Sequence, residues 1–501
     1  MFSIPISGLR AGLVALVGLS FVTGAAAQPD ATDPNVVVRY DGHRVVSIDI
    51  TDAAVLERVV GLGRDLWCCE PRRGPTHFRA RPEVMAALDA SGIAYRVEIE
   101  NLQAEVDAEA ERIRAGRRGV LRPPAMHGHV EPGGELDAGD WFADFKNLDA
   151  IVARMDELAA LRPDIATRFT FGSTHNGREL QGLRITNDAA NEGRCKPVML
   201  FNSTQHAREW IAPMTTMFLA EHLVTNHGSV PRITELVDRV EFLIVPVSNP
   251  DGYVHSWTTS RFWRKNRRNN GNGTFGVDLN RNWGHMWGIT LPHQSAGNGN
   301  PSSDVYWGPS AFSEPETQAL RDLVLSKPGF RGHNDVHSHG QMLLHPWAWT
   351  NQDSPHAAWF LETGSEMQSL ILAVHGLTYR PGKWYNVLYP SAGAAVDWMY
   401  ADRGAVTYTV ELRGGRFDPA PSHIRPCGEE NLPAFLYHAE WVMAEFPFKA
   451  DWNGDCVYDI FDFIDFQNDF AARLPRADYN GDLIFDIFDF LEFANDFVIQ
   501  R

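Results

Sequence analysis

The sequence KPVMLFNSTQHAREWIAPMTTMFLAEHLV, residues 196–224, passes from a continuous apolar run into a segment with helical spacing. Two similar apolar runs occur at VEFLIVPVSNPDG (240–252) and GAVTYTVELRGG (404–415), and NLDAIVARMDELAAL (147–161) has apolar residues at three- and four-residue steps. Buried runs of strand length that alternate with helices are typical of an α/β sheet covered on both faces. The sequence therefore predicts an α/β fold from about residue 140 onward.

Polar residues with metal-binding chemistry follow these strands, where open α/β sheets place their ligands. His206 and Glu209 lie at the strand-to-helix transition, and a three-residue step can turn both side chains to one side. Catalytic zinc usually takes three His or carboxylate ligands and leaves a fourth position for water. His337, in GHNDVHSHGQMLLHPW (332–347), is the candidate third ligand. A lone HxxE motif often occurs by chance, so motifs elsewhere in the chain are needed to judge whether it binds metal.

Length and charge exclude several classes of protein. A chain of 501 residues is too long for one ordinary domain, and an apolar fraction of 44% is that of a folded protein. The net charge of −18 argues against a nucleic-acid or anionic-membrane partner. Five cysteines, of which Cys68 and Cys69 are adjacent, do not indicate a disulfide framework.

The N-terminus has the pattern of a secretory signal. Arg10 precedes the short apolar run AGLVALVGLSFV (11–22), and TGAAAQ (23–28) has the small residues that signal peptidases cut. We expect a signal peptide over residues 1–27 and an exported protein; the alternative is a buried helix of the mature chain. No other stretch is long and apolar enough to predict a transmembrane segment.

Residues 36–110 predict a small α+β unit that precedes the main fold. HRVVSIDI (43–50) and NVVVRY (35–40) have strand patterns, DAAVLERVVGLG (52–63) has helical spacing, and RPEVMAALDASGIAYRVEIENLQ (81–103) predicts helix, turn and strand. A Pro/Gly-rich linker is predicted over 111–139. It carries four arginines, so it is either a solvated connection or a site for trypsin-like activation: Arg112, Arg114, Arg117 and Arg118.

The C-terminus contains an internal repeat. DWNGDCVYDIFDFIDFQNDF (451–470) recurs as DYNGDLIFDIFDFLEFANDF (478–497), and twelve acidic against three basic side chains lie between 451 and 501. Oxygen-bearing residues recur at positions 1, 3, 5, 9 and 12 of each copy, as in calcium loops. The sequence predicts a small all-α calcium-loop unit over 448–501. Its candidate calcium ligands are Asp451, Asn453, Asp455, Asp459, Asp462, Asp478, Asn480, Asp482, Asp486 and Asp489.

Residues 140–447 resemble the zinc metallocarboxypeptidases of the carboxypeptidase A/B type. HAREW (206–210) and VHSHGQ (336–341) are similar to the family's metal motifs. FWRKNRR (262–268), GVDLNRNW (276–283), LYPSAGAAVDW (388–398) and VELRGG (410–415) match its other motifs in the same order. This resemblance implies a mixed central sheet with helices on both faces, a zinc cofactor, and peptide substrates with a free C-terminus. The 36–110 unit is similar to the family's pro-domain, which implies a zymogen.

The resemblance also implies catalytic roles. Glu411 corresponds to the general base, which takes a proton from the attacking water and later gives it to the leaving amine. Arg267 corresponds to the arginine that stabilises the oxyanion, and solvation is the simpler expectation for Arg264 in the same run. Asp278 is placed to accept the free ring N–H of His206.

Five residues correspond to substrate-binding positions of the family. Asn280 and Arg281 are expected to bind the terminal carboxylate, with Tyr389 closing over the substrate and Arg208 guiding it. The residue seven after the loop tyrosine, Val396, corresponds to the floor of the specificity pocket. Since the other matching pocket positions, Leu344, Ala348 and Thr409, carry no charge, we expect apolar or aromatic C-terminal residues to be preferred. Asp397, directly after Val396, is the residue that could reverse this preference.

The C-terminal repeat resembles the duplicated dockerin module of secreted bacterial enzymes, which binds a cohesin partner. A cohesin-like or cell-surface partner is therefore a possibility that this resemblance raises. The usual glycine at loop position 6 is Cys456 in the first copy and Leu483 in the second.

Two other functions compete with the carboxypeptidase. One is a zinc amidase or endopeptidase acting on cell-wall peptides, which would not need Asn280, Arg281 and Tyr389 together. The other is a non-catalytic peptide-binding homologue, which loss of a zinc ligand or of Glu411 would have favoured. The sequence favours a secreted zinc carboxypeptidase.

Overall fold

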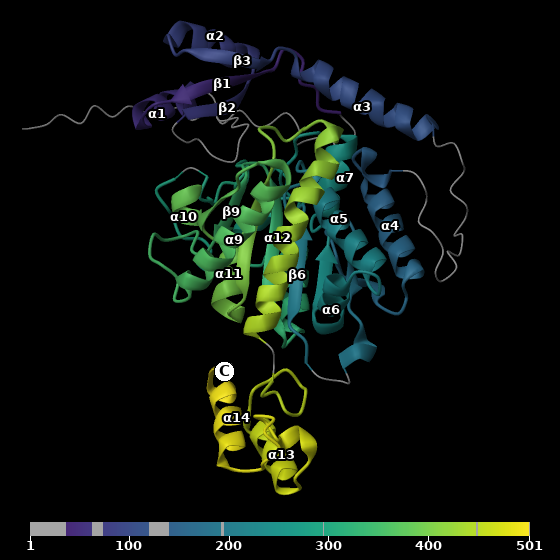
Figure 1. The fold of residues 1–501 in the computed structure, drawn as a ribbon. Helices are drawn as coiled ribbons and strands as arrows, with labels where there is room; N and C mark the ends of the chain where they lie inside the picture. The colour runs from purple at the N-terminus through teal and green to yellow at the C-terminus, as the bar shows by residue number, and fades with distance from the viewer. Residues whose placement is uncertain are drawn as a thin grey trace, which may run out of the picture.

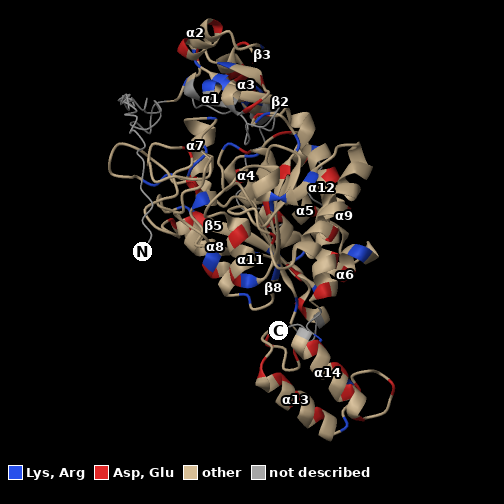
Figure 2. Ribbon diagram, turned by 90° about the vertical axis from the view of Figure 1, so that its left-hand side faces the viewer, with Lys and Arg blue, Asp and Glu red and all other residues tan. Residues whose placement is uncertain are grey.

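The computed structural model describes residues 37–62, 74–119, 140–191, 195–293, 295–446 and 449–499. The predicted signal peptide and residues 120–139 of the predicted linker lie outside these ranges. Figures 1 and 2 show a large central unit with a small unit at each end, formed by the N-terminal and the C-terminal parts of the chain.

The central unit contains an eight-stranded mixed sheet in the order β10-β9-β11-β8-β6-β7-β5-β4. The inner pairs β11–β8, β8–β6 and β6–β7 are parallel, whereas β9–β11, β7–β5 and β5–β4 are antiparallel. The predicted fold class is confirmed. The strands are β4 (Ala166–Ser173), β5 (Glu179–Ile185), β6 (Val198–Ser203), β7 (Glu241–Val245), β8 (Phe330–Ser338), β9 (Met342–His345), β10 (Arg380–Lys383) and β11 (Val406–Leu412).

Helices cover both faces of this sheet (Figure 1). Along β6, Met199 and Phe201 join the apolar core under α5 and α12, whereas Val198 and Leu200 join a second core under α8 and α11. This alternation explains why the strand has no polar face. The helices are α4 (Leu148–Leu161), α5 (Ile211–Asn226), α6 (Pro231–Arg239), α7 (Pro250–Thr258), α8 (Pro315–Leu325), α9 (Ala357–His375), α10 (Trp384–Val387), α11 (Ala395–Arg403) and α12 (Ile424–Glu445).

The N-terminal unit is a three-stranded antiparallel sheet, β2-β1-β3, packed with short helices. The predicted strand at NVVVRY is absent from its described residues, 37–40. The predicted boundary at residue 110 also differs from the structure, because α3 continues to Gly119 and so contains Arg112 and Arg114. The elements are β1 (Arg44–Ile50), α1 (Ala53–Leu62), β2 (Gly74–Ala80), α2 (Pro82–Ser91), β3 (Tyr95–Ile99) and α3 (Leu102–Gly119).

Contacts between the N-terminal and central units are both apolar and ionic. Tyr40 packs edge-on against Phe262, and Glu109 pairs with the buried Arg261 at 2.6 Å. Arg112 forms an ion pair with Asp144. The N-terminal unit thus contacts the central unit both after α7 and in the segment before α4.

The C-terminal unit consists of α13 (Ile460–Ala471) and α14 (Ile487–Ile499) with their preceding loops. Its core is aromatic, with Phe466 and Phe493 stacked at 4.1 Å between ring centroids. Acidic side chains are distributed along both helices (Figure 2). At position 6 of both loops, Cys456 and Leu483 have a φ of 66°, so each adopts the left-handed conformation for which glycine is usual.

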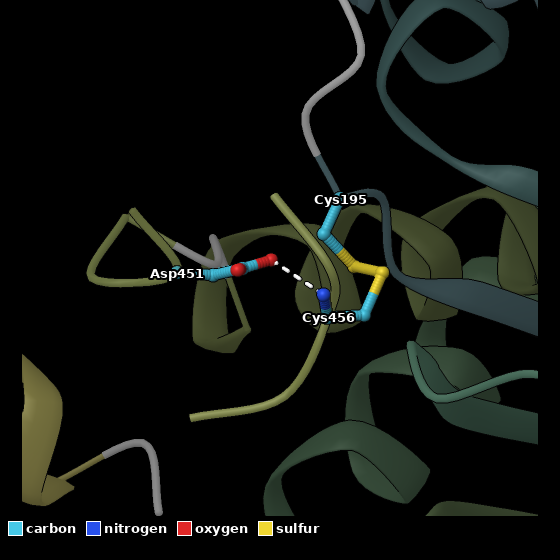
Figure 3. Close-up of side chains that lie close together, drawn as sticks. All are labelled: Cys195, Asp451 and Cys456. Carbon is cyan, nitrogen blue, oxygen red and sulfur yellow. Dashed lines mark hydrogen bonds between the residues drawn. A yellow bond between two sulfur atoms is a disulfide. The ribbon is translucent and has the colours of Figure 1, made fainter. Parts of the chain in front are cut away.

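A disulfide joins the C-terminal unit to the central sheet. Cys195, three residues before β6, pairs with Cys456, and their Cα atoms lie 5.1 Å apart (Figure 3). The sequence did not predict this pairing, because residues 261 apart in the chain give no local signal of it. Cys427 is buried and free, and Cys68 and Cys69 lie outside the described residues.

Within the described residues, no helix has both the length and the apolarity needed to span a membrane.

We expect proteolytic peptide mapping without reductant to recover the Cys195 and Cys456 peptides as one cross-linked species. Cys456→Ser should lower the thermal midpoint of the C-terminal unit, since losing such a cross-link costs about 2–4 kcal/mol. Leu483→Ser, at the same position of the second loop, is the matched control and should leave the midpoint nearly unchanged. Recovery of two separate peptides without reductant would contradict the pairing.

Candidate metal centre and active site

Three potential metal ligands converge beyond the carboxyl ends of the central strands. His206 and Glu209 follow β6, and His337 lies near the end of β8. His206 Nδ1 lies 2.9 Å from Glu209 Oε1, and His337 Nδ1 lies 3.0 Å from both His206 Nδ1 and Glu209 Oε2. All three residues are buried. The predicted ligand set is therefore brought together, one atom from each residue lying within 4.8 Å of the others.

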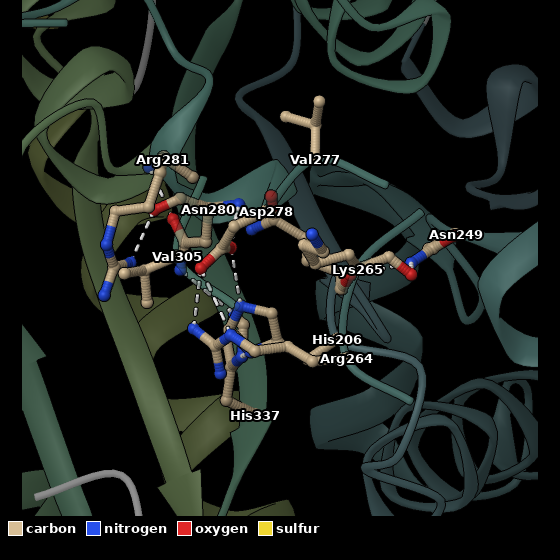
Figure 4. A network of polar contacts seen from close by, with 12 residues as sticks. His206, Asn249, Arg264, Lys265, Val277, Asp278, Asn280, Arg281, Val305 and His337 are labelled. Atoms are coloured by element: carbon tan, nitrogen blue, oxygen red, sulfur yellow. Dashed lines mark hydrogen bonds and ion pairs between the residues drawn. The ribbon is translucent and has the colours of Figure 1, made fainter. Parts of the chain in front are cut away.

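Two carboxylates orient the histidine rings, and Figure 4 shows the contact of one of them, Asp278, with His206. His206 Nε2 lies 3.0 Å from Asp278 Oδ1, which is the contact expected from the sequence, and His337 Nε2 lies 2.8 Å from Asp335 Oδ2. A carboxylate partner fixes the proton on Nε2 and leaves the Nδ1 lone pair free. Both lone pairs then point at each other and at Glu209, an arrangement that a shared cation stabilises.

The electrostatics of the cluster also favour a cation. Burial and the neighbouring Arg264 lower the pKa of His206, which keeps this ring neutral as a metal ligand must be. Burial opposes a charge on His337, but Asp335 and Glu209 raise its pKa well above the usual range. The site therefore attracts positive charge even though it is closed to solvent.

Glu411 lies beside the ligand cluster. It is on β11 directly opposite His337 on β8, and its side chain is buried. Within the described part of the chain, Glu411 Oε2 is buried without a hydrogen-bond partner. Burial, with a contribution from Glu209, raises the pKa of Glu411 to about 8. A carboxylate in this position can accept a proton and release it again near neutral pH.

The arginine that the structure brings into the cluster is Arg264. It is 6% exposed, and its Nε and Nη2 donate to Asp278 Oδ2 at 3.1 and 2.9 Å (Figure 4). The expectation that Arg264 is solvated was wrong. The guanidinium of Arg267 instead lies over the rings of Trp263 and Phe275, at 4.6 and 4.7 Å from the ring centroids.

Three of the predicted substrate-binding residues assemble next to the metal ligands. Asn280 Nδ2 lies 3.3 Å from His337 Nε2, and its Oδ1 accepts from Ala395 N at 2.9 Å. Arg281 is held by the carbonyl oxygens of Asn280 and Ser295 and donates from Nη2 to Tyr389 Oη at 3.2 Å. The guanidinium of Arg281 and the phenol of Tyr389 thus contact each other, and the Asn280 amide lies beside the metal ligand His337.

Comparisons with known proteins agree with this geometry. The family model described as "Zinc carboxypeptidase" matches residues 151–434. The chain belongs to the zinc carboxypeptidase family. It is 32% identical over 373 residues to zinc carboxypeptidase A 1 of Drosophila melanogaster, covering 72% of this chain and 80% of that protein. Identity to human carboxypeptidase B is 30% over 376 residues, covering 73% and 83%.

The fold of this zinc carboxypeptidase is similar to that of solved relatives. The carboxypeptidase A from Helicoverpa armigera aligns with a TM-score of 0.68 at 28% identity, covering 81% of this chain and 98% of that one. The chain is thus a zinc metallocarboxypeptidase, a peptide hydrolase. The donor set described above fits a catalytic zinc, with two neutral imidazoles and one carboxylate as ligands.

The residues predicted to line the specificity pocket are all buried. Val396 is fully buried in a cluster that includes Leu344 and Ala348. Asp397 is also buried, but both of its carboxylate oxygens accept from Ala348 N, at 2.9 and 3.1 Å. Thr409 is buried on β11, two residues before Glu411.

Arg208 lies at the entrance to α5, apart from the other substrate-binding candidates in its described contacts. Its guanidinium lies over the ring of Phe417 at 4.0 Å, and its carbonyl oxygen accepts from Arg261. His339, where the family usually has a tyrosine, packs against the same Phe417 ring at 4.8 Å.

The candidate calcium ligands are engaged in loop hydrogen bonds. Asp451 accepts from the N–H groups of Gly454, Asp455 and Cys456, and Asp462 accepts from those of Trp452, Asn453 and Asp459. In the second copy, Asp489 is equivalent to Asp462 and accepts from the corresponding backbone N–H groups. Among the described residues, no group of converging potential metal ligands consists of these loop carboxylates only.

Two residues of the site were missed by the sequence reasoning. Asp335 stands two residues before His337 on the same strand, so the strand period of two places both on one face. That spacing was a usable signal. Arg264 directly follows Trp263 in an apolar context, and nothing in the run of basic residues distinguished it from Arg267.

The two arginines can be separated experimentally. We expect Arg264→Lys to lower kcat by about a hundredfold to a thousandfold, the usual effect of removing one oxyanion donor, because an ammonium cannot reproduce the fork that grips Asp278. Arg267→Lys is the matched control and should stay within a few-fold of the parent. Steady-state kinetics of both purified variants, at equal zinc content, measures this. A larger loss in Arg267→Lys would restore the assignment made from the sequence.

Proposed function

We propose that this enzyme is a secreted, zinc-dependent exopeptidase that removes apolar or aromatic C-terminal residues from peptides and is made as a zymogen. The observation that supports this specificity is the apolar cluster around Val396, the residue predicted to form the pocket floor. The neighbouring carboxylate of Asp397 already accepts hydrogen bonds from Ala348 N. A cation buried against Val396 would lose its hydration without gaining a partner. An apolar side chain would instead gain transfer free energy there.

The residues of the active site are assigned different roles in catalysis. Zinc held by His206, Glu209 and His337 would supply Lewis acidity that polarises the scissile carbonyl. Glu411 would accept a proton from the attacking water and donate it to the leaving amine, which its raised pKa supports. Arg264, a permanent cation beside the cluster, is the better candidate than Arg267 for stabilising the oxyanion.

Recognition of a free C-terminus is supported by Asn280, Arg281 and Tyr389. Arg281 has a planar guanidinium that can bind a carboxylate, and Tyr389 Oη lies 3.2 Å from Arg281 Nη2. A cell-wall amidase or an endopeptidase would have no use for this combination. Arg208 remains a candidate for guiding the substrate.

A zymogen is supported by the N-terminal unit and its attachment. The ion pair between Glu109 and Arg261 and the packing of Tyr40 on Phe262 hold the unit against the central unit (Figure 1). Cleavage within 112–122 would release it, although α3 extends over the first part of that range. Secretion rests on the signal-like residues 1–27.

The C-terminal unit is proposed to bind calcium and to attach the enzyme to a cohesin-like or cell-surface partner. The repeated oxygen-bearing positions and the left-handed backbone at Cys456 and Leu483 support calcium loops. Its location away from the metal centre is compatible with attachment that leaves the active site accessible.

Specificity can be tested with blocked peptides ending in Phe, Leu, Lys and Arg. We expect kcat/KM for Phe and Leu to exceed that for Lys and Arg by roughly a hundredfold, which corresponds to about 3 kcal/mol. Val396→Asp should shift the preference toward Lys and Arg, while Asp397→Asn should leave the ratio within a few-fold of the parent. Faster release of Lys or Arg by the parent enzyme would refute the assignment of Val396.

Activation can be tested on the purified full-length chain. We expect low activity before proteolysis, and a rise after mild trypsin treatment as a fragment of about 12 kDa is released. Gel electrophoresis followed over time links the two events. Replacing the four arginines from Arg112 to Arg118 with glutamine should slow both. A full-length protein as active as the cut form would rule out the zymogen.

A further inference from the structure

A second cluster of metal-binding side chains lies outside the catalytic centre. His175 stands in the turn between β4 and β5, Glu314 is the N-cap of α8, and Glu316 is in the first turn of that helix. One potential ligand atom from each lies within 4.8 Å of the other two. Nothing in the catalytic geometry uses these residues.

The two carboxylates of this cluster are fully buried, but their surroundings differ. Glu314 Oε1 accepts from Arg268 and Ser313, and its Oε2 accepts from Asn266 and lies 2.9 Å from His175 Nε2. Glu316 Oε2 accepts from Asn266 at 3.1 Å. Within the described part of the chain, Glu316 Oε1 is buried without a hydrogen-bond partner. An ionised oxygen in that situation is costly unless a cation or a proton is close to it.

The cluster has the composition and access of a divalent-metal site. The 2.9 Å between His175 Nε2 and Glu314 Oε2 fits two ligands of one ion, whose bonds of about 2.0–2.2 Å bring neighbouring ligand atoms to about 3 Å. The His175 side chain is 30% exposed, whereas both glutamates are 0% exposed, so an ion can enter past the imidazole. The N-terminus of α8 favours ionised carboxylates, the form that binds metal.

We propose that His175, Glu314 and Glu316 form a second divalent-metal site, of the imidazole-and-carboxylate type that zinc accepts, with a structural role. Asn266 connects it to the active site, since its Nδ2 donates to both glutamates and its Oδ1 accepts from Val277 N. Asn266 is two residues after Arg264, and Val277 immediately precedes Asp278. An ion here would brace the two segments that carry the Arg264–Asp278 pair.

The test is the zinc stoichiometry of the full-length chain, measured by elemental analysis and by titration of chelator-treated protein. Excess calcium in the buffer occupies oxygen-only loops, which zinc does not favour. We expect two zinc ions per chain for the parent and one for Glu316→Gln, which preserves shape. His175→Ala, on an exposed turn, should also retain one, and His337→Ala should lose the other ion.

Controls distinguish loss of the second ion from a general loss of metal binding. Glu235→Gln, an exposed glutamate on α6, should keep two ions. The Glu316→Gln and His175→Ala variants should still bind the catalytic zinc and hydrolyse peptides. A parent chain that binds one ion, or unchanged stoichiometry in both variants, would overturn the proposal and assign Glu316 a buried proton instead.

Discussion

The carboxylate of Asp278 is the interaction on which the catalytic centre depends. Its Oδ1 lies 3.0 Å from His206 Nε2 and accepts from Asn280 N at 3.0 Å, while its Oδ2 accepts from Arg264. One buried charge therefore fixes the tautomer of a metal ligand, the position of a cation and the turn that presents Asn280. Burial opposes the ionised form, but Arg264 and His206 outweigh that cost and hold the pKa of Asp278 well below its usual value.

The direction of the strands separates the functions of the chain. His206 and Glu209 follow β6, and His337 lies near the carboxyl end of β8. Cys195 precedes β6 and binds the C-terminal unit at the opposite end of the sheet. The N-terminal unit contacts the residues after α7, on the same side as the ligands (Figure 1). The parallel strands at the centre of the mixed sheet therefore place the metal ligands and the N-terminal unit at one end and the C-terminal unit at the other.

The sequence predicted features that depend on nearby residues of the chain, and it missed features that depend on contacts between distant segments. Strands β6, β7 and β11 are buried on both faces, so their composition alone indicated them. The motifs predicted the three side chains that the structure brings together at the candidate metal centre. Edge strands β4 and β10 have partly exposed, mixed patterns and gave no such signal. Arg264 could not be distinguished from Arg267, and Cys195 could not be paired with Cys456, because both outcomes depend on contacts between distant segments.

The cysteine at position 6 shows how a duplicated unit became asymmetric. Both loops need a left-handed residue there, and Cys456 and Leu483 adopt the same φ although neither is glycine. Leu483 is 87% exposed, so position 6 points outward, and the same direction in the first loop carries Cys456 to Cys195. The strained position is therefore also the one best placed to reach another unit. The cross-link holds the first loop against the catalytic unit and leaves the second loop to solvent.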